Sequence, residues 1–127
     1  MVEEIFAKRF KGESITHEEE LVFKTAFMVA LGKEYNKKNN RIAAICAAPS
    51  ILGNLGLLEG KKAMAFPGFE TQLTGAVIIT APERVVTDGN ITTSRGMGTS
   101  LDLGLELVRL IKGEELAEQL RTSTQYI

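Results

Sequence analysis

The stretch RIAAICAAPSILGNLG, residues 41–56, decides the fold that we expect for this chain. Its first six residues form a short apolar run after the polar turn KKNN (residues 37–40). Such a run is typical of a strand in a parallel sheet that helices cover on both faces. The residues after it predict a short helix with Pro49 in its first turn, where the missing N–H of proline costs nothing. The stretch therefore predicts a strand, a sharp turn and a helix, with Cys46 at the turn.

Cys46 is the only cysteine of the chain, and its predicted position suits a nucleophile. It would project from the carboxyl end of a strand, where ligands bind in open α/β sheets. The N-terminal end of the following helix stabilises a thiolate, and the amide of Ala47 is placed to donate a hydrogen bond to an oxyanion. Free cysteines are also often small buried hydrophobic residues without chemistry. The residues themselves leave both interpretations open.

Upstream of this stretch, we expect a helix that begins after Ser14 or Thr16 and ends near Tyr35. Either residue is a good N-cap, and the glutamates of the run HEEE (17–20) suit the positive end of the helix. The body of this helix is apolar on most sides, so we expect it to be covered. Residues 1–13 are charged and predict a frayed helix or an arm. His17, the only histidine, is expected on the solvated surface rather than as a base or a ligand.

Downstream, the sequence predicts more strands and a long helix. Residues 61–66 and 75–80 favour strands, and residues 84–94 favour a hairpin that turns at Asp88–Gly89 or Gly89–Asn90. The loop at residues 96–99 leads into a helix over 100–113, and residues 114–127 predict a further helix or tail. On the long helix, Asp102, Glu106 and Arg109 are expected to form a solvated stripe. Alternating strands and helices indicate the α/β class.

The composition argues against several classes of function. The chain has 127 residues, which indicates a single domain, and its net charge of −1 gives no reason to expect a nucleic-acid partner. One cysteine and one histidine exclude an internal disulfide and argue against a metal site. We expect no cofactor. Since no apolar run spans a bilayer and residues 1–13 do not resemble a signal peptide, we expect no membrane partner and a cytoplasmic location.

Several consecutive blocks resemble the carboxyl-terminal half of the ThiJ/PfpI family, in its DJ-one branch. The blocks are AICAAP, LLEGKKA, FPGFE, VTDGNITTSRGMGT and the helix SLDLGLELVRLIKG, and they cover residues 41–113. The resemblance implies a flavodoxin-like three-layer sandwich with a mainly parallel sheet, N-terminally truncated or rearranged. It divides the single domain into a divergent helical segment (1–40), a ThiJ/PfpI-like core (41–113) and a C-terminal helix or tail (114–127).

The resemblance also assigns roles to residues. Cys46 matches the reactive, readily oxidised cysteine of the family, and Ala47 matches the residue whose amide contacts that sulfur. Family members have been assigned glyoxalase or deglycase activity on small reactive carbonyls, and oxidant sensing. We expect Gly98 to help bind an anion and Phe66 and Arg95 to support the site. Phe66 stands where some members carry a histidine.

Residues 1–40 contain no counterpart of three family features: the first βαβ units, the glutamate that bonds the cysteine, and the PGG loop. Glu18 and Glu19 are the only candidates for that glutamate, and their position at a helix start explains their charge without it. The strand at residues 41–46 then becomes an exposed edge, which soluble proteins avoid. We therefore expect a homo-oligomer or a complementing chain.

Three hypotheses follow. The first is a cysteine-dependent protein that acts on small carbonyl compounds or senses oxidants. The second is a non-catalytic remnant or subunit of a ThiJ/PfpI-like assembly. The third, a domain that binds a phosphorylated ligand, rests only on the glycine loop at residues 96–99 and ranks last.

Overall fold

The computed structural model describes residues 1–126 and consists of helices around two small sheets. In chain order the elements are α1 (Val2–Phe10), α2 (His17–Lys37), β1 (Ile42–Ile45), α3 (Pro49–Asn54), β2 (Lys62–Ala63), the 3₁₀ turn η1 (Glu70–Gln72), β3 (Val77–Ile78), β4 (Val85–Asp88), β5 (Ile91–Ser94), the 3₁₀ turn η2 (Met97–Thr99), α4 (Ser100–Lys112) and α5 (Glu114–Ser123).

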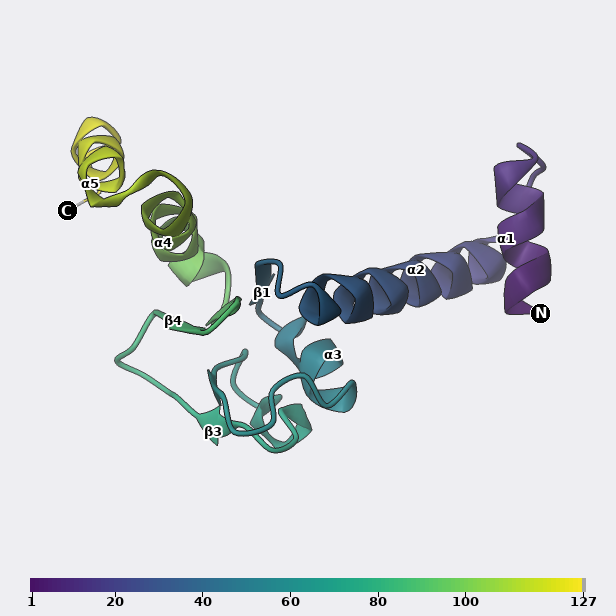
Figure 1. Cartoon of the computed structure of the whole chain (residues 1–127), viewed down its shortest axis with the longest axis horizontal. Helices are drawn as coiled ribbons and strands as arrows, with labels where there is room; N and C mark the ends of the chain where they lie inside the picture. The colour runs from purple at the N-terminus through teal and green to yellow at the C-terminus, as the bar shows by residue number, and fades with distance from the viewer. Residues whose placement is uncertain (127) are drawn as a thin grey trace.

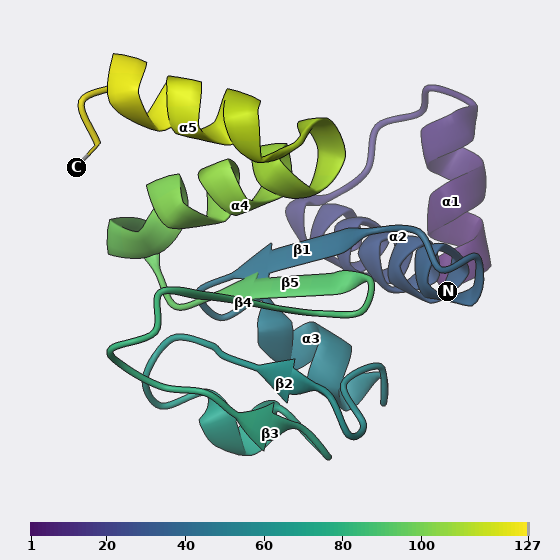
Figure 2. The same ribbon diagram turned by 60° about the vertical axis from the view of Figure 1, so that its left-hand side comes forward.

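The main sheet has the strand order β1-β5-β4. β1 and β5 are parallel, with Ile42 opposite Ile91 and Ile45 opposite Ser94, whereas β4 and β5 are antiparallel. The second sheet pairs β2 and β3 in parallel. α4 and α5 lie on one side of the main sheet, and α3 with the β2–β3 pair lies on the other (Figure 2). The expected α/β fold with a mainly parallel, layered sheet is therefore confirmed.

β5, rather than β1, is the fully buried strand. All four residues of β5 are buried, whereas Ala43 of β1 is exposed and its neighbours are half-buried. The interpretation of residues 41–46 as a strand covered on both faces was therefore wrong, because β1 lies at the edge of the sheet. The apolar core lies under β5 and contains Leu52, Leu58, Ala63, Ala65, Leu73 and Ile91.

The predicted hairpin and capped helices are present. β4 and β5 form the hairpin, and Gly89 has the positive φ of +60° that the turn requires. α3 begins at Pro49, and Gly113 ends α4 with a φ of +103°. The strands expected over residues 61–66 and 75–80 form, but each is only two residues long.

α2 projects from the start of β1 as a long arm (Figure 1). None of its 21 residues is buried, so the expectation of a covered helix was wrong for this chain alone. α1 crosses the far end of the arm and is held there by Phe6, whose ring centroid lies 4.6 Å from that of Phe23. The arm exposes large apolar side chains, among them Leu21, Phe27, Met28 and Tyr35.

Two of the three residues of the expected solvated stripe on α4, Asp102 and Glu106, are mostly buried, contrary to our expectation, whereas Arg109 is exposed as expected. Only 17% of the Asp102 side chain and 16% of the Glu106 side chain are exposed. Glu106 accepts a hydrogen bond of 2.8 Å from Thr87 in β4. Two apolar residues of the same helix, Leu101 and Ile111, are instead more than half exposed. These carboxylates therefore belong to the packing between α4, the hairpin and the C-terminal segment.

Candidate functional site

Cys46 lies on a sharp turn between β1 and α3, as the sequence predicts. Its φ is +65°, in the left-handed region that residues with a Cβ rarely adopt. Two backbone hydrogen bonds hold the turn. The Cys46 amide donates to the carbonyl oxygen of Ser94 (3.1 Å), and the Cys46 carbonyl accepts from the amide of Phe66 (2.8 Å). Both peptide groups that flank the Cys46 Cα are thus tied to neighbouring segments.

The residue after Cys46 has an unused backbone donor. Within residues 1–126 the amide of Ala47 donates to no acceptor. Cys46 itself is half-buried. No side chain in that part of the chain forms a hydrogen bond with its Sγ, and no acidic residue is bonded to it. A half-accessible thiol beside a free amide can react with a small electrophile and stabilise the oxygen anion that results.

Phe66 and the segment after β5 lie around the turn. The Phe66 ring is 46% exposed, and a Cβ added to Gly96 would lie 3.3 Å from it, so the ring covers the backbone at Gly96. Arg95 follows Ser94, the acceptor for the Cys46 amide, and is half-buried. The Nε of Arg95 is buried and finds no partner within residues 1–126. The structure thus brings Phe66 and Arg95 into segments that are bonded to the Cys46 turn.

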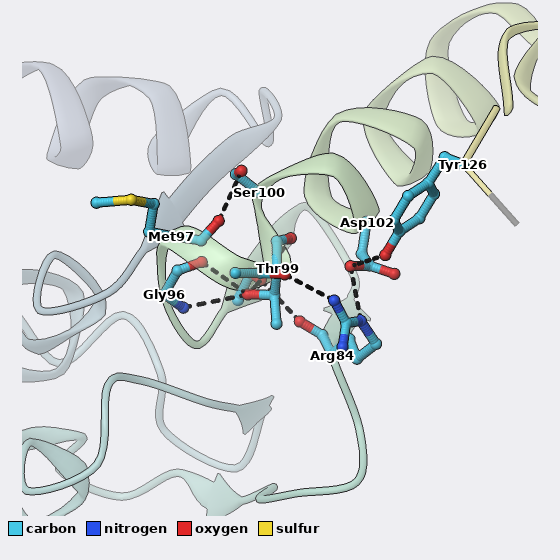
Figure 3. Close-up of polar contacts among 9 residues, drawn as sticks. Arg84, Gly96, Met97, Thr99, Ser100, Asp102 and Tyr126 are labelled. Carbon is cyan, nitrogen blue, oxygen red and sulfur yellow. Dashed lines mark hydrogen bonds and ion pairs between the residues drawn. The ribbon is translucent and has the colours of Figure 1, made fainter. Parts of the chain in front are cut away.

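Hydroxyl groups anchor the loop that follows Ser94 and Arg95; Figure 3 shows Gly96, Met97 and Thr99 of this loop. The Ser94 side chain is fully buried, and its Oγ donates to the carbonyl of Arg84 (2.7 Å) and contacts Thr99 Oγ1 (2.6 Å). Thr99 Oγ1 in turn accepts from the Gly96 amide (3.1 Å). Sequence reasoning missed this network. Its only signal was the dense run of hydroxyl residues in TTSRGMGTS, which is otherwise typical of exposed loops.

The hydrogen bonds of Gly98 lead away from the cysteine. Its carbonyl accepts a hydrogen bond from the Arg84 guanidinium (2.6 Å), which also pairs with Asp102 (2.8 Å). The Tyr126 phenol donates to the same carboxylate oxygen of Asp102 (2.7 Å), so the end of the described chain closes this cluster (Figure 3). No hydrogen bond joins Gly98 to the Cys46 turn within residues 1–126.

These contacts shift the acidity of the carboxyl groups on α4. Burial raises the pKa of Asp102, but the hydrogen bonds from Tyr126 and Arg84 outweigh it, so the pKa lies below its ordinary value. The hydrogen bond from Arg109 lowers the pKa of Glu106, and the bond from Thr87 acts in the same direction against burial. The Asp102 carboxylate also raises the pKa of Tyr126. Both carboxylates are therefore stabilised as anions by structural partners.

His17, Glu18 and Glu19 lie at the far end of the α2 arm, near α1 (Figure 1). With a rise of about 1.5 Å per residue, the helix places them on the order of 30 Å from β1. Glu19 is engaged there in a capping box with Thr16 and in an ion pair with Lys8 (3.0 Å). The structure therefore excludes Glu18 and Glu19 as acidic partners of Cys46 within one chain.

An apolar cavity of about 240 Å³ lies on the open side of β1, between α2 and α3. Met28, Leu31, Ala44, Ile51 and Leu55 are among its lining residues, and Cys46 is not. The cavity is therefore a feature of the exposed sheet edge rather than of the cysteine. Within residues 1–126 no cluster of metal-ligating side chains occurs, and no helix is long and apolar enough to cross a membrane.

Comparison with known proteins gives consistent matches. The family model described as the DJ-1/PfpI family matches residues 17–110, and therefore includes α2 as well as the segment from β1 onward. The protein DJ-1 homolog B of Arabidopsis thaliana is 42% identical over 98 residues, which are 76% of this chain and 22% of that protein.

Solved structures show the same likeness. Drosophila melanogaster DJ-1beta superposes with a TM-score of 0.69 at 30% identity, over 79% of this chain and 54% of that one. An oxidised DJ-1 of Toxoplasma gondii superposes with a TM-score of 0.70 at 31% identity, over 76% of this chain and 52% of that one. The chain thus spans between about a fifth and about half of the length of these relatives.

Proposed function

This chain belongs to the DJ-1/PfpI family and has its flavodoxin-like fold, and on that premise we propose that Cys46 is a nucleophile for small reactive carbonyl compounds. The observation that carries the proposal is the geometry of the turn. Cys46 is held at a φ of +65° by hydrogen bonds on both sides, while the amide of Ala47 stays free beside it. A turn of this kind presents a side chain and an oxyanion donor to the same small volume.

The proposed step is addition of the thiol to an aldehyde. The Cys46 Sγ forms a bond to the carbonyl carbon, and the C=O electron pair moves onto the oxygen. The Ala47 amide donates to that oxygen while it carries the negative charge, and a proton from the thiol or from water then completes a hemithioacetal. Because no acidic side chain is bonded to Sγ within residues 1–126, the proton moves through solvent in this chain alone. We therefore expect addition to be reversible and any onward rearrangement to be slow.

Oxidation of Cys46 is the second function that the site supports. Attack of a thiolate on a peroxide breaks the O–O bond, transfers one oxygen to sulfur and releases water, and a second peroxide converts the sulfenate to a sulfinate. This reaction needs a thiolate and access but no separate acid–base residue, and it therefore suits a thiol without a bonded carboxyl. We place either reaction in the cytoplasm, where an unpaired thiol stays reduced.

The test of the carbonyl reaction uses methylglyoxal and intact-protein mass spectrometry. Incubation of the chain with methylglyoxal should give a single adduct that maps to Cys46 and reverses when the reagent is removed. Cys46→Ser should give no such adduct. An adduct distributed over lysines and arginines, with Cys46 unmodified, would show that the site does not favour carbonyl addition.

A matched variant separates the oxyanion donor from the nucleophile. Ala47→Pro removes the free amide and keeps the thiol, although it also restrains the turn. We expect this variant to form less adduct. The control is Ala48→Ser, at the next position, which is exposed; it should form as much adduct as the parent. If Cys46 is oxidised by peroxide but forms no adduct with methylglyoxal, the sensing function replaces the carbonyl function. If it does neither, the chain is a non-catalytic member of the family.

A further inference from the structure

The left-handed conformation of Cys46 has to be maintained by its surroundings. The Cβ of a non-glycine residue is sterically crowded in this region, so a single cysteine there persists only where neighbouring groups fix it. The amide of Cys46 has one partner, the carbonyl oxygen of Ser94. The position of that oxygen therefore decides whether the Cys46 turn keeps its shape.

Ser94, the last residue of β5, is held by its side chain as well as by the backbone pairing of the sheet. Its side chain is fully buried, and its Oγ joins the Arg84 carbonyl before β4 to Thr99 at the start of α4. These contacts form one connected network. The Gly96 amide donates to Thr99 Oγ1, which also lies 2.9 Å from the Gly96 carbonyl and 2.6 Å from Ser94 Oγ, and Ser94 Oγ donates to the Arg84 carbonyl. Both buried hydroxyl groups thus have hydrogen-bond partners on more than one segment.

We propose that Ser94 and Thr99 are positioning residues of the cysteine site, which hold the Ser94 carbonyl so that Cys46 stays in its left-handed turn with the Ala47 amide free. Within residues 1–126 neither hydroxyl group forms a hydrogen bond with the sulfur. They act through the hydrogen bond from the Cys46 amide to Ser94, and the proposal concerns reactivity only in so far as Cys46 is the nucleophile proposed above. The network is confined to backbone and hydroxyl groups, so no titration is required for it to act.

Thr93 provides the matched control. It is the neighbouring residue of β5, is equally buried, and its Oγ1 accepts a hydrogen bond from the Met64 amide (3.0 Å) on the β2 side. Thr93→Val and Thr99→Val therefore each remove one buried hydroxyl that has backbone partners, and both should lower the unfolding temperature. Only Thr99→Val removes a group of the network that ends at Cys46.

Two measurements on the whole chain test the proposal. The first is hydrogen exchange of the Cys46 amide, and the second is the rate of Cys46 alkylation by iodoacetamide at pH 7. For Thr99→Val and for Ser94→Ala we expect amide protection to fall about tenfold and the alkylation rate to fall by a similar factor. Thr93→Val should leave both within about twofold of the parent, and Thr99→Ser should restore them.

The outcomes separate this proposal from the proposed function. Unchanged Cys46 amide protection in Thr99→Val and Ser94→Ala would overturn the positioning role, and so would equal losses in Thr93→Val and Thr99→Val. If protection falls as expected but the parent cysteine reacts no faster than in the unfolded chain, the positioning of the turn stands and the nucleophile proposal fails. If Thr99→Val does not fold, Ser94→Ala and the comparison with Thr99→Ser decide the question.

Discussion

At the scale of single residues, Cys46 has a strained backbone conformation that hydrogen bonds on both of its peptide groups maintain. The residue has a φ of +65°, and its amide and carbonyl are bonded to Ser94 and Phe66. Non-glycine residues in such conformations concentrate at functional sites, where the surrounding structure compensates for the strain. In this chain the compensation comes from segments far apart in sequence, the ends of β1 and β5 and the stretch after β2.

The strain predicts an unusual response to substitution. Glycine adopts a positive φ without steric cost, whereas alanine keeps the Cβ that causes the strain. Cys46→Gly should therefore be at least as stable as Cys46→Ala, and by up to about 1 kcal/mol more stable, although glycine normally destabilises an ordered position. Urea unfolding of the two variants measures this difference. An alanine variant that is clearly the more stable of the two would show that the turn carries no strain in solution.

Sequence reasoning located the cysteine but not its supports. The strand, the proline-started helix and the small residues between them define a turn from local pattern alone, so Cys46 and Ala47 could be placed in advance. Ser94 and Thr99 could not, because a hydroxyl on a predicted hairpin or loop is normally solvated. Their burial depends on α4 closing over the end of β5, which is a tertiary event that no local pattern encodes.

At the scale of elements, α2 is an arm whose stability depends on its own sequence. None of its residues is buried, so capping and α1 contribute a large share of what holds it. Thr16 supplies the cap: its Oγ1 accepts from the Glu19 amide (3.1 Å), and the Glu19 carboxylate accepts from the Thr16 amide (2.9 Å). Of the two caps that the sequence allowed, the structure selects Thr16 over Ser14.

Removal of this cap should loosen the arm and leave the sheet intact. Thr16→Ala costs on the order of 1 kcal/mol of helix stability, because the first amides of α2 lose their acceptor. We expect faster hydrogen exchange over the first turns of α2 and unchanged exchange in β5. Ser14→Ala is the control, since Ser14 forms no hydrogen bond within residues 1–126. Equal effects of the two variants would contradict the assigned cap.

The two mostly buried carboxylates of α4, Asp102 and Glu106, predict sensitivity to acid. The pKa of Asp102 and that of Glu106 are both lowered in the folded chain, so the unfolded chain binds protons more readily. Their contribution to stability is present above the ordinary carboxyl pKa of about 4 and is lost as the pH falls through the lowered values. Tyr126→Phe, which leaves Asp102 bonded to Arg84 alone, should weaken this dependence.

Unfolding free energy measured between pH 7 and pH 2 provides the comparison. Tyr35→Phe is a suitable control because the Tyr35 phenol forms no hydrogen bond within the described part of the chain. The parent and the Tyr35→Phe variant should lose stability in parallel below pH 4, and Tyr126→Phe should lose less over the same range. Identical acid profiles for all three proteins would show that Tyr126 does not stabilise the Asp102 carboxylate.

At the scale of the whole molecule, the cysteine-bearing strand is a sheet edge. In the parallel ladder with β5, the amides of Ile42 and Cys46 point toward β5, so those of Ala43 and Ile45 point to the open side. The apolar cavity beside that edge and the exposed apolar residues of α2 extend the same surface. An uncovered edge of this kind is a template for strand pairing.

We expect the isolated chain to pair with a second copy along β1. An antiparallel pair with its twofold axis at Ala44 brings only small side chains together at the centre and places the two Arg41 guanidinium groups at opposite ends, so no like charges meet. Sedimentation at micromolar concentration should give twice the chain mass of 13.9 kDa. Ala43→Pro removes an outward amide without breaking the ladder to β5 and should give monomers. A monomeric parent chain would contradict the pairing.

The layered fold was predictable because it follows from the order of apolar runs, turns and glycines. The free edge was expected as well, since residues 1–40 contain no strand to cover it. The exposure of α2 and the burial of Asp102 and Glu106 on α4 could not be predicted, because an amphipathic pattern shows which residues share a helix face but not which element that face contacts. The apolar residues of α2 therefore suggested a covered helix, whereas none of them is buried in this chain alone.

The rate of Cys46 alkylation by iodoacetamide at pH 7, in the folded chain and in the same chain unfolded in urea, tests whether the fold creates a reactive thiol. The unfolded chain supplies the reference rate of an ordinary cysteine, with a thiol that ionises near pH 8.5. A reactive site requires the folded chain to react several times faster, despite the partial burial of Cys46. A folded rate equal to or below the unfolded rate would contradict it and leave Cys46 as a structural residue of the turn.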